Sequence, residues 1–226
     1  MTKIYLIRHC ESEGNAGGVF QGSTDSEISD KGKLQLVELA ARFKDIHLDA
    51  LYSSPLKRAR ATAEAVGSRQ SLPVRIEPDL IEIHGGEWEG LTVRELNVPK
   101  YAEQFDHWYN NLSKFRAPSG ESSAEIYERA TNALMKIASE HKDQTVAVTS
   151  HGFVINLCLQ WADGIAKENV VGGEDYWVRN TSVSLLQLDL KPSIVYMNDF
   201  AHLTTEELIS DFLIDEADKE FITTSP

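Results

Sequence analysis

The stretch Lys3–Ile7, with the sequence KIYLI, is followed directly by Arg8 and His9. A short, mostly apolar run that stops at polar residues predicts a buried β-strand. The run Thr145–Thr149 (TVAVT) is rich in β-branched residues and ends in the same way, at Ser150-His151-Gly152. We therefore expect both runs to be central strands of a sheet, with polar residues placed at their carboxyl ends.

Helical patterns alternate with these strands. Ser29 is placed to cap a helix, Pro55 stands at the start of a helix over Leu56 to Val66, and Ser122 with Glu125 forms a capping box. Shorter strands are expected at Ala50–Ser53, Pro73–Glu77, Val183–Asp189 and Ser193–Asn198. This alternation predicts the α/β class, with a three-layer α/β/α sandwich and a mostly parallel central sheet.

The 226 residues are enough for one sizeable core, and we expect a single domain. The chain has no internal repeat, low-complexity segment or long linker that would mark a second domain. Two segments differ from the rest. Residues 92–121 are expected to form a cap-like insertion, and residues 199–226 form an acidic C-terminal segment.

The formal net charge is −13, from 22 Lys and Arg against 35 Asp and Glu. Nucleic acids and anionic membranes bind basic surfaces, so neither is expected as a partner. Eight acidic residues against one Lys between Asp199 and Glu220 supply −7 of this charge. The acidic segment is therefore interpreted as a solvated face or a surface for a partner. An anionic ligand needs a local basic pocket.

The cysteine content restricts the chemistry. Cys10 and Cys158 are too few for a disulfide scaffold, a Cys-based zinc site or an iron–sulfur cluster. The opening apolar run stops at Arg8, far short of a signal-peptide core, and no later run approaches membrane-spanning length. We expect a cytoplasmic protein.

Three polar clusters each follow a predicted strand: Arg8-His9, Ser53-Ser54 leading to Arg58, and Ser150-His151-Gly152. In an open α/β sheet, ligands bind beyond the carboxyl ends of the strands, so the clusters should face one crevice. Planar, permanently charged guanidinium groups pair bidentately with phosphate oxygens. The helix expected after His151 offers free N–H groups to an anion, and Gly152 allows close approach. The crevice is therefore predicted to bind a phosphoryl group.

Four motifs in a fixed order carry a resemblance to a known family. They are Arg8-His9-Cys10-Glu11-Ser12-Glu13-Gly14-Asn15 with Phe20-Gln21-Gly22 and Asp25; Ser53-Ser54-Pro55-Leu56-Lys57-Arg58-Ala59 with Thr62-Ala63; Glu82 ahead of Gly86-Glu87-Trp88-Glu89-Gly90-Leu91; and Ser150-His151-Gly152. Together they make the chain resemble the histidine phosphatase superfamily, which has the phosphoglycerate mutase-like fold.

The resemblance implies a mechanism. His9 is the expected nucleophile, and its attack on phosphorus forms a phosphohistidine. Arg8 helps to keep the His9 imidazole unprotonated. Arg8, Arg58 and His151 hold the equatorial phosphoryl oxygens. Glu82 serves as the general acid and then as the base, which requires a raised pKa. Neither a metal nor another cofactor is implied.

Further residues of the motifs are expected at the phosphate. Asn15 and Gln21 are candidate amide donors to the phosphoryl group, although both could instead only brace their loop. Gly22 and Gly152 are expected to bring backbone close to the phosphate.

The acid could also be misassigned among neighbouring carboxylates. Glu82 is chosen from its motif position, and Glu87 and Glu89 are the alternatives. His84 is expected to be an exposed loop residue. Cys10 stands where the family most often has Gly, and we expect a small buried filler there; the alternative is an oxidisable thiol whose pKa Arg8 lowers.

Net hydrolysis is expected rather than a mutase reaction. A mutase retains a bisphosphorylated intermediate and needs extra cations and a closing lid. The stretch between Leu91 and Ser122 supplies few cations: Arg94, Lys100, Lys114 and Arg116. We expect a metal-independent phosphatase for a small phosphorylated substrate, acting as a monomer or homodimer. The alternatives are phosphoglycerate mutase-type transfer and a catalytically silent phosphate-binding or partner-binding module.

The same stretch carries five aromatic residues: Tyr101, Phe105, Trp108, Tyr109 and Phe115. Two interpretations stay open. The aromatic side chains either close the crevice over a partly apolar or sugar-like leaving group, or pack an inserted helix pair onto the domain.

Overall fold

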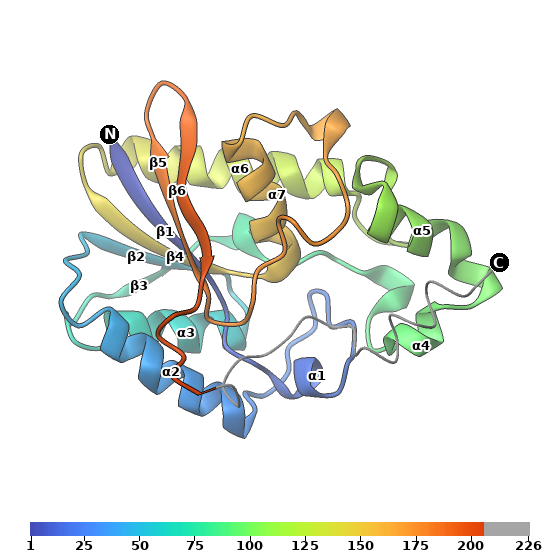
Figure 1. Cartoon of the computed structure of the whole chain (residues 1–226), viewed down its shortest axis with the longest axis horizontal. Coiled ribbons are helices and arrows are strands. Elements are labelled where there is room, and N and C mark those ends of the chain that lie inside the picture. The colour runs from blue at the N-terminus through green and yellow to red at the C-terminus, as the bar shows by residue number, and fades with distance from the viewer. Residues whose placement is uncertain (206–226) are drawn as a thin grey trace.

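A computed structural model describes residues 1–205, which build a six-stranded sheet with helices packed around it (Figure 1). The strand order is β3-β2-β4-β1-β5-β6, with β4 and β1 at the centre. The strands are β1 (Thr2–Arg8), β2 (Ala50–Ser53), β3 (Val74–Ile76), β4 (Thr145–Ser150), β5 (Val183–Leu188) and β6 (Pro192–Asp199). All the strands predicted from the sequence are confirmed, with small differences at their ends.

The sheet is parallel where the site is built. β1, β2, β3 and β4 run parallel, whereas β5 is antiparallel to β1 and β6 is antiparallel to β5. The short turn between β5 and β6 explains why β6 is antiparallel to β5, because a tight turn can join only antiparallel strands. Arg8 pairs with Ser150 and Ser53 pairs with Thr149. The three polar clusters predicted at strand ends therefore lie at one edge of the sheet.

Helices cover both faces of the sheet. Figure 1 shows α2 (Asp30–Arg42) and α3 (Lys57–Gly67) on one face, and α6 (Ser123–Glu140) and α7 (Gly152–Ala162) on the other. β1 contributes alternately to both sides: Ile4 and Leu6 pack into the larger core with α6 and α7, while Ile7 packs with α2 and α3. The predicted three-layer α/β/α sandwich is confirmed.

Local signals set the helix starts. The Ser29 side chain accepts a hydrogen bond from the Gly32 N–H, and Ser122 and Glu125 form the predicted capping box. The start of α3 differs from the prediction, because the helix begins at Lys57 and leaves Pro55 outside it. Leu56 has no side chain that can cap, and the Lys57 N–H donates instead to Asp25 from the loop after β1, at 2.9 Å.

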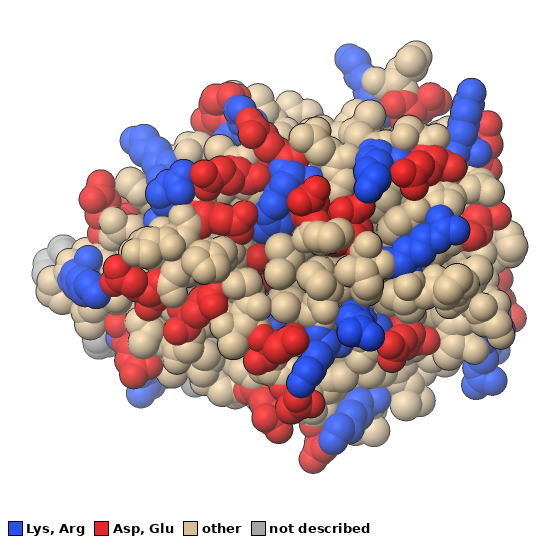
Figure 2. Space-filling view, turned by 180° about the vertical axis from the view of Figure 1, so that it is seen from behind, with Lys and Arg blue, Asp and Glu red and all other residues tan. Residues whose placement is uncertain are grey.

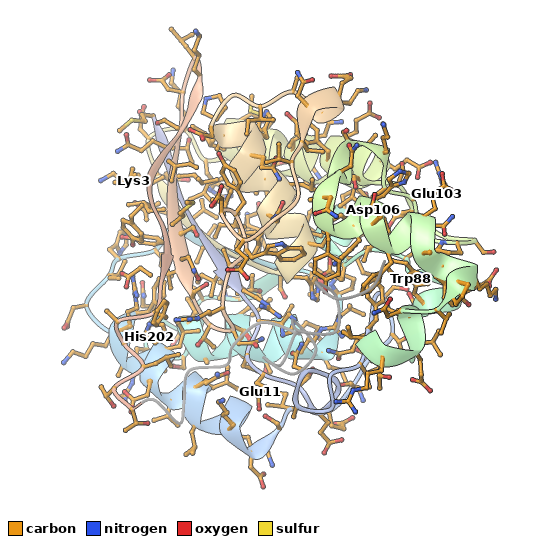
Figure 3. All side chains as sticks on the ribbon, turned by 45° about the vertical axis from the view of Figure 1, so that its right-hand side comes forward. Lys3, Glu11, Trp88, Glu103, Asp106 and His202 are labelled. Carbon is orange, nitrogen blue, oxygen red and sulfur yellow. The ribbon has the colours of Figure 1, made fainter. Side chains whose placement is uncertain are left out.

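The segment 92–121 folds onto the face that carries α6 and α7. It contains α4 (Val93–Leu96), α5 (Ala102–Asn110) and the 3-10 turns η3 (Pro99–Tyr101) and η4 (Leu112–Lys114). Figure 3 labels Trp88, Glu103 and Asp106 around α5; Glu103 and Asp106 are exposed, whereas Trp88 is fully buried. The inner side buries Phe105 and Trp108 against Trp88. Of the two interpretations of these aromatics, this packing fits the second, in which they hold inserted helices on the domain.

The shorter helical elements frame the site. They are α1 (Glu13–Ala16), η1 (Pro78–Leu80), η2 (Gly86–Trp88) and η5 (Lys167–Asn169). On the face seen in Figure 2, Lys and Arg alternate with Asp and Glu, and no continuous basic patch forms there. Within residues 1–205 no helix is both long and apolar enough to cross a membrane. Most of the acidic segment 199–226 lies outside the described residues.

Candidate active site

His9 follows β1 directly and is buried, with 3% of its surface exposed. Its Nδ1 lies 2.6 Å from the Cys10 carbonyl oxygen. A carbonyl oxygen can only accept, so Nδ1 carries the proton and Nε2 keeps a lone pair. Burial, followed by the nearby charges of Arg58 and Arg8, holds the pKa of His9 well below its usual value. His9 therefore presents an unprotonated Nε2.

Arg8 and Arg58 place two buried guanidinium groups beside His9. Arg58 donates from Nη1 to the Thr24 carbonyl and from Nη2 to the Gly22 carbonyl, both at 2.8 Å. Arg8 donates from Nη1 to the Val178 carbonyl at 2.5 Å. Burial lowers the pKa of Arg8 to about 10, so it stays charged at neutral pH. Because Arg58 donates these hydrogen bonds to neutral carbonyl oxygens, its buried charge favours an anionic ligand.

His151 lies next to His9 at the start of α7. The two ring centroids are 5.1 Å apart. His151 Nε2 is 2.6 Å from the Ser54 hydroxyl, and Nδ1 has no hydrogen-bond partner within the described chain. Burial, followed by the charge of Arg58, holds the pKa of His151 well below its usual value. The polar ends of β1, β2 and β4 thus lie close together. Arg8, His9, Arg58 and Gly152 line the pocket, whereas His151 is fully buried beside His9 and does not line it.

Glu82 follows η1 and lines the same pocket as His9. Its Oε1 accepts from the Ile83 N–H at 3.0 Å, and its Oε2 accepts from the Phe153 N–H at 3.2 Å. Burial raises the pKa of Glu82, although these two hydrogen bonds and the arginines oppose the shift. The Phe153 N–H is one of the free amides of α7 that the sequence assigned to phosphate, and the structure assigns it to Glu82 instead.

Arg129, on α6, holds the segment that carries Glu82. Its Nη1 donates to the Asp79 and Ile81 carbonyls, each at 2.7 Å, and its Nε contacts Glu121 at 2.9 Å. Sequence reasoning missed this residue, because an isolated Arg in a helical pattern usually indicates a solvated position. The one feature of the sequence that points to Arg129 is its position beside the apolar residues of an amphipathic helix.

The loop after β1 contributes neutral donors. Asn15 and Gln21 both line the pocket. The Ser12 hydroxyl lies 3.0 Å from Asn15 Oδ1 and 2.9 Å from Gln21 Oε1, and its single proton can be donated to either oxygen. Both amides therefore brace the loop with their oxygens, and each offers its NH₂ group as a donor to a phosphoryl oxygen.

The two glycines assigned to the phosphate site also line the pocket. Gly22 has φ of +52°, and a Cβ there would lie 2.5 Å from Glu89 Oε1. Its carbonyl holds Arg58, so Gly22 acts on the phosphate site at least through that arginine. A Cβ at Gly152 would touch the Arg8 guanidinium at 3.4 Å. Both positions keep the arginines in place.

The alternative carboxylates are engaged elsewhere, and neither lines the pocket. Glu89 Oε1 accepts from the Ser23 N–H and hydroxyl and from the Gly85 N–H. Glu87 pairs with Lys100 at 2.7 Å. His84 is exposed and likewise does not line the pocket. Among these carboxylates Glu82 alone faces the pocket.

The Cys10 thiol is fully buried. Burial raises its pKa to about 11, and Arg58 opposes that shift only weakly. Cys10 therefore fits the expectation of a small buried residue that fills space. The alternative, a thiol with a lowered pKa, is wrong. The charge of Arg8 does not reach this sulfur strongly enough to offset its burial.

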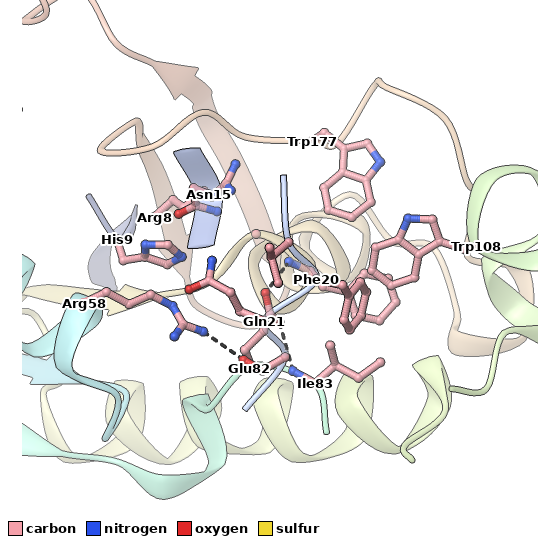
Figure 4. A pocket seen from close by; sticks show the side chains of 14 residues that line it. Arg8, His9, Asn15, Phe20, Gln21, Arg58, Glu82, Ile83, Trp108 and Trp177 are labelled. Carbon is pink, nitrogen blue, oxygen red and sulfur yellow. Dashed lines mark hydrogen bonds between the residues drawn. The ribbon is translucent and has the colours of Figure 1, made fainter. Parts of the chain in front are cut away.

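Figure 4 shows how the pocket is divided. His9, Arg8 and Arg58 lie at one end, and Trp108 and Trp177 lie at the other. The pocket encloses about 430 Å³ of empty space, part of which is open to solvent. Within residues 1–205, no group of three or more His, Cys, Asp or Glu side chains is arranged to hold a metal ion. The arrangement offers a nucleophile, an acid and two fixed cations around one phosphoryl-sized space.

Comparison with known proteins gives a family match over most of the chain. A model described as "Histidine phosphatase superfamily (branch 1)" matches residues 4–199. "Phosphoserine phosphatase 1" of Hydrogenobacter thermophilus is 41% identical over 151 residues, which cover 67% of this chain and 71% of that protein.

Two further comparisons extend over more of the chain. "Metal-independent phosphoserine phosphatase" of Arabidopsis thaliana is 34% identical over 212 residues, covering 91% of this chain and 84% of that protein. The solved structure of Bacillus stearothermophilus YhfR superposes with a TM-score of 0.82 at 28% identity, covering 89% of this chain and 99% of that one.

Proposed function

Because the chain belongs to the histidine phosphatase superfamily, we propose that it is a metal-independent phosphatase that hydrolyses a small phosphomonoester through a phosphohistidine on His9. The observation that carries this proposal is the state of His9. Its Nδ1 proton is held by the Cys10 carbonyl, and its Nε2 is unprotonated next to Arg8 and Arg58. A neutral imidazole between two fixed cations is suited to attack on phosphorus.

In the first step, His9 Nε2 attacks phosphorus and the bond from phosphorus to the leaving oxygen breaks. Arg8 and Arg58 stabilise the charge on the equatorial oxygens, and His151 donates from Nδ1. Glu82 gives its proton to the leaving alcohol. The raised pKa of Glu82 favours the protonated form that this step needs. The Cys10 carbonyl stabilises the proton that stays on His9 Nδ1.

In the second step, water attacks the phosphohistidine and the bond between nitrogen and phosphorus breaks. Glu82, now a carboxylate, takes a proton from the attacking water. Inorganic phosphate leaves, and His9 returns to its neutral form. Glu82 is thus reset for the next cycle.

Hydrolysis is favoured over a mutase reaction by the charges in the pocket. Arg8 and Arg58 are the cations among the described residues that line it. A second phosphoryl group on a bound intermediate would need further cations at the other end. There the segment 92–121, which we propose caps the site, supplies Trp108.

The proposal is tested with 4-nitrophenyl phosphate and phosphoserine in excess chelator, comparing the wild type with His9→Ala. We expect metal-free turnover by the wild type, a loss of at least about 10⁴-fold in the variant, and an acid-labile phosphoprotein in the wild type alone. His47→Ala, which removes an exposed histidine, is the matched control and should retain activity.

Each alternative has its own signature. Turnover that persists in His9→Ala contradicts the proposal. Phosphoryl exchange between phosphoglycerates without net hydrolysis indicates a mutase. Phosphate binding with no turnover of any ester indicates a silent binding module.

A further inference from the structure

The end of the pocket away from His9 is built from aromatic side chains. We call Phe20, Trp108, Phe153 and Trp177 the aromatic wall; all four line the pocket. Trp108 stacks on Phe153 with ring centroids 4.5 Å apart, and Phe153 lies parallel to Trp177 at 6.0 Å. Phe20 meets Trp108 edge to face at 5.4 Å. The wall is therefore a packed unit that borders the pocket, and the half-buried Trp177 is its most accessible ring.

The wall is held rigidly on its inner side. Phe153 and Trp108 are 1% and 6% exposed, and Trp108 also packs on Phe115 and Trp88. Trp177 is only half-buried, and its ring lies over Gly152, where a Cβ would approach it to 3.7 Å. A leaving group would thus meet a fixed aromatic surface on one side and a more accessible ring on the other.

The charges of the pocket lie at its opposite end. Of the described residues that line it, Arg8 and Arg58 are the cations, and Figure 4 shows both beside His9 and away from Trp108 and Trp177. Val19 and Ile83 extend the apolar lining. An ester whose phosphoryl group occupies the arginines therefore projects its alcohol toward apolar surface.

This division disfavours a charged leaving group. Phosphoserine and 3-phosphoglycerate both carry a carboxylate close to the phosphate ester. Placed against the aromatic wall, that carboxylate would lose hydration without gaining a cation, which is costly. A flat apolar ring there would instead lose unfavourable contact with water and gain stacking.

We propose that the preferred substrate is a phosphomonoester of an uncharged alcohol that carries a flat apolar ring, which stacks on the aromatic wall. This inference rests on the proposed phosphatase function and names the substrate class of the same site. Trp108 is the main specificity-determining residue, because it contacts both Phe20 and Phe153 and faces the pocket.

The test compares benzyl phosphate with phosphoserine and 3-phosphoglycerate. Benzyl phosphate and phosphoserine are both esters of primary alcohols, so the comparison does not rest on an activated phenolic leaving group. We expect kcat/KM for benzyl phosphate to exceed that for phosphoserine by at least about tenfold. The preference should appear mainly in KM.

Variants of the wall supply the second arm. Trp108→Ala should lower kcat/KM for benzyl phosphate by about tenfold and leave phosphoserine within about twofold. Trp177→Ala, at a half-buried position, repeats the measurement if Trp108→Ala does not fold. Trp161→Ala removes a tryptophan of α7 that does not line the pocket, and it should leave the ratio of the two substrates unchanged.

The possible outcomes distinguish failure of this inference from failure of the proposed phosphatase function. If phosphoserine or 3-phosphoglycerate is hydrolysed as efficiently as benzyl phosphate, the inference is overturned and the phosphatase stands. If the wall variants lower kcat/KM for both esters equally, the wall is structural and the inference is also overturned. If the wild type hydrolyses none of the esters, the proposed function itself fails.

Discussion

The two ends of the pocket are built in different ways. The phosphate end comes from residues next to strand ends: Arg8 and His9 after β1, Ser54 after β2, and His151 after β4. The aromatic wall comes from four separate segments that meet only through side-chain packing. The first end is fixed by the sheet register, whereas the second depends on how an insertion and two loops lie against α7.

This difference assigns the chemical reaction to the phosphate end and the recognition of the alcohol to the aromatic wall. Groups at the phosphate end act on phosphorus and the leaving oxygen, which every phosphomonoester shares. Groups in the aromatic wall meet only the rest of the alcohol, which differs between substrates. Changes at the phosphate end should therefore follow the basicity of the leaving alcohol, and changes in the wall should follow its shape and charge.

The largest effect that tests this division is expected from Glu82→Gln. The amide cannot supply the proton that a basic leaving alcohol needs, so kcat/KM for benzyl phosphate should fall by about 10³-fold. The loss for 4-nitrophenyl phosphate should be less than about tenfold, because its leaving phenolate needs little proton transfer. Both esters carry a ring, so the difference reports basicity rather than shape.

The pH profile gives the matching control. Glu82 must be protonated in the first step, and burial raises its pKa. For benzyl phosphate, kcat/KM should therefore fall as the pH rises through that raised pKa. Glu82→Gln should remove this alkaline limb. Persistence of the limb in the variant would show that another group supplies the proton.

A smaller effect is expected from Arg129→Met, since Arg129 does not itself line the pocket. The substitution removes the donors to the Asp79 and Ile81 carbonyls and loosens the segment before Glu82. Misplacing the acid should lower kcat/KM for benzyl phosphate by about tenfold. The inhibition constant of inorganic phosphate should not change, because Arg8, His9 and Arg58 are untouched.

Arg116→Met is the matched control, since it removes an exposed arginine that pairs with Glu125. It should keep both kcat/KM and the pH profile. If Arg129→Met weakens phosphate inhibition as strongly as it slows the reaction, then Arg129 supports the whole site rather than the acid. Equal losses for benzyl phosphate and 4-nitrophenyl phosphate would lead to the same conclusion.

How well the sequence predicts each end of the pocket depends on whether its residues lie in contiguous motifs or come together only through tertiary packing. The strands, the fold class and the clustering of His9, Arg58 and His151 could be predicted, because each residue lies in a contiguous motif next to a strand end. The acid at Glu82 was also distinguishable from Glu87 and Glu89 by motif position, and the structure places it alone in the pocket.

Contacts between distant segments could not be predicted. The sequence predicts that the free N–H groups at the start of α7 favour an anion, but it does not show that one of them, that of Phe153, donates to Glu82. The stacking of Trp108 on Phe153 and the position of Trp177 depend on tertiary packing, which leaves no local pattern in the sequence. The aromatic residues of segment 92–121 can be recognised in the sequence as a group, but their contacts with Phe20, Phe153 and Trp177 cannot.

The smallest effect is expected at Cys10, a residue inside the phosphate-end motif. Its thiol is buried and has a pKa raised to about 11, so it is almost entirely protonated at neutral pH. Cys10→Ala should keep kcat/KM within about twofold, and peroxide should inactivate the wild type and the variant at the same rate. A disulfide reagent should modify the wild-type thiol only after unfolding. Faster inactivation of the wild type would mean that the thiol becomes accessible during turnover, and the phosphate end would then be less rigid than the sheet register implies.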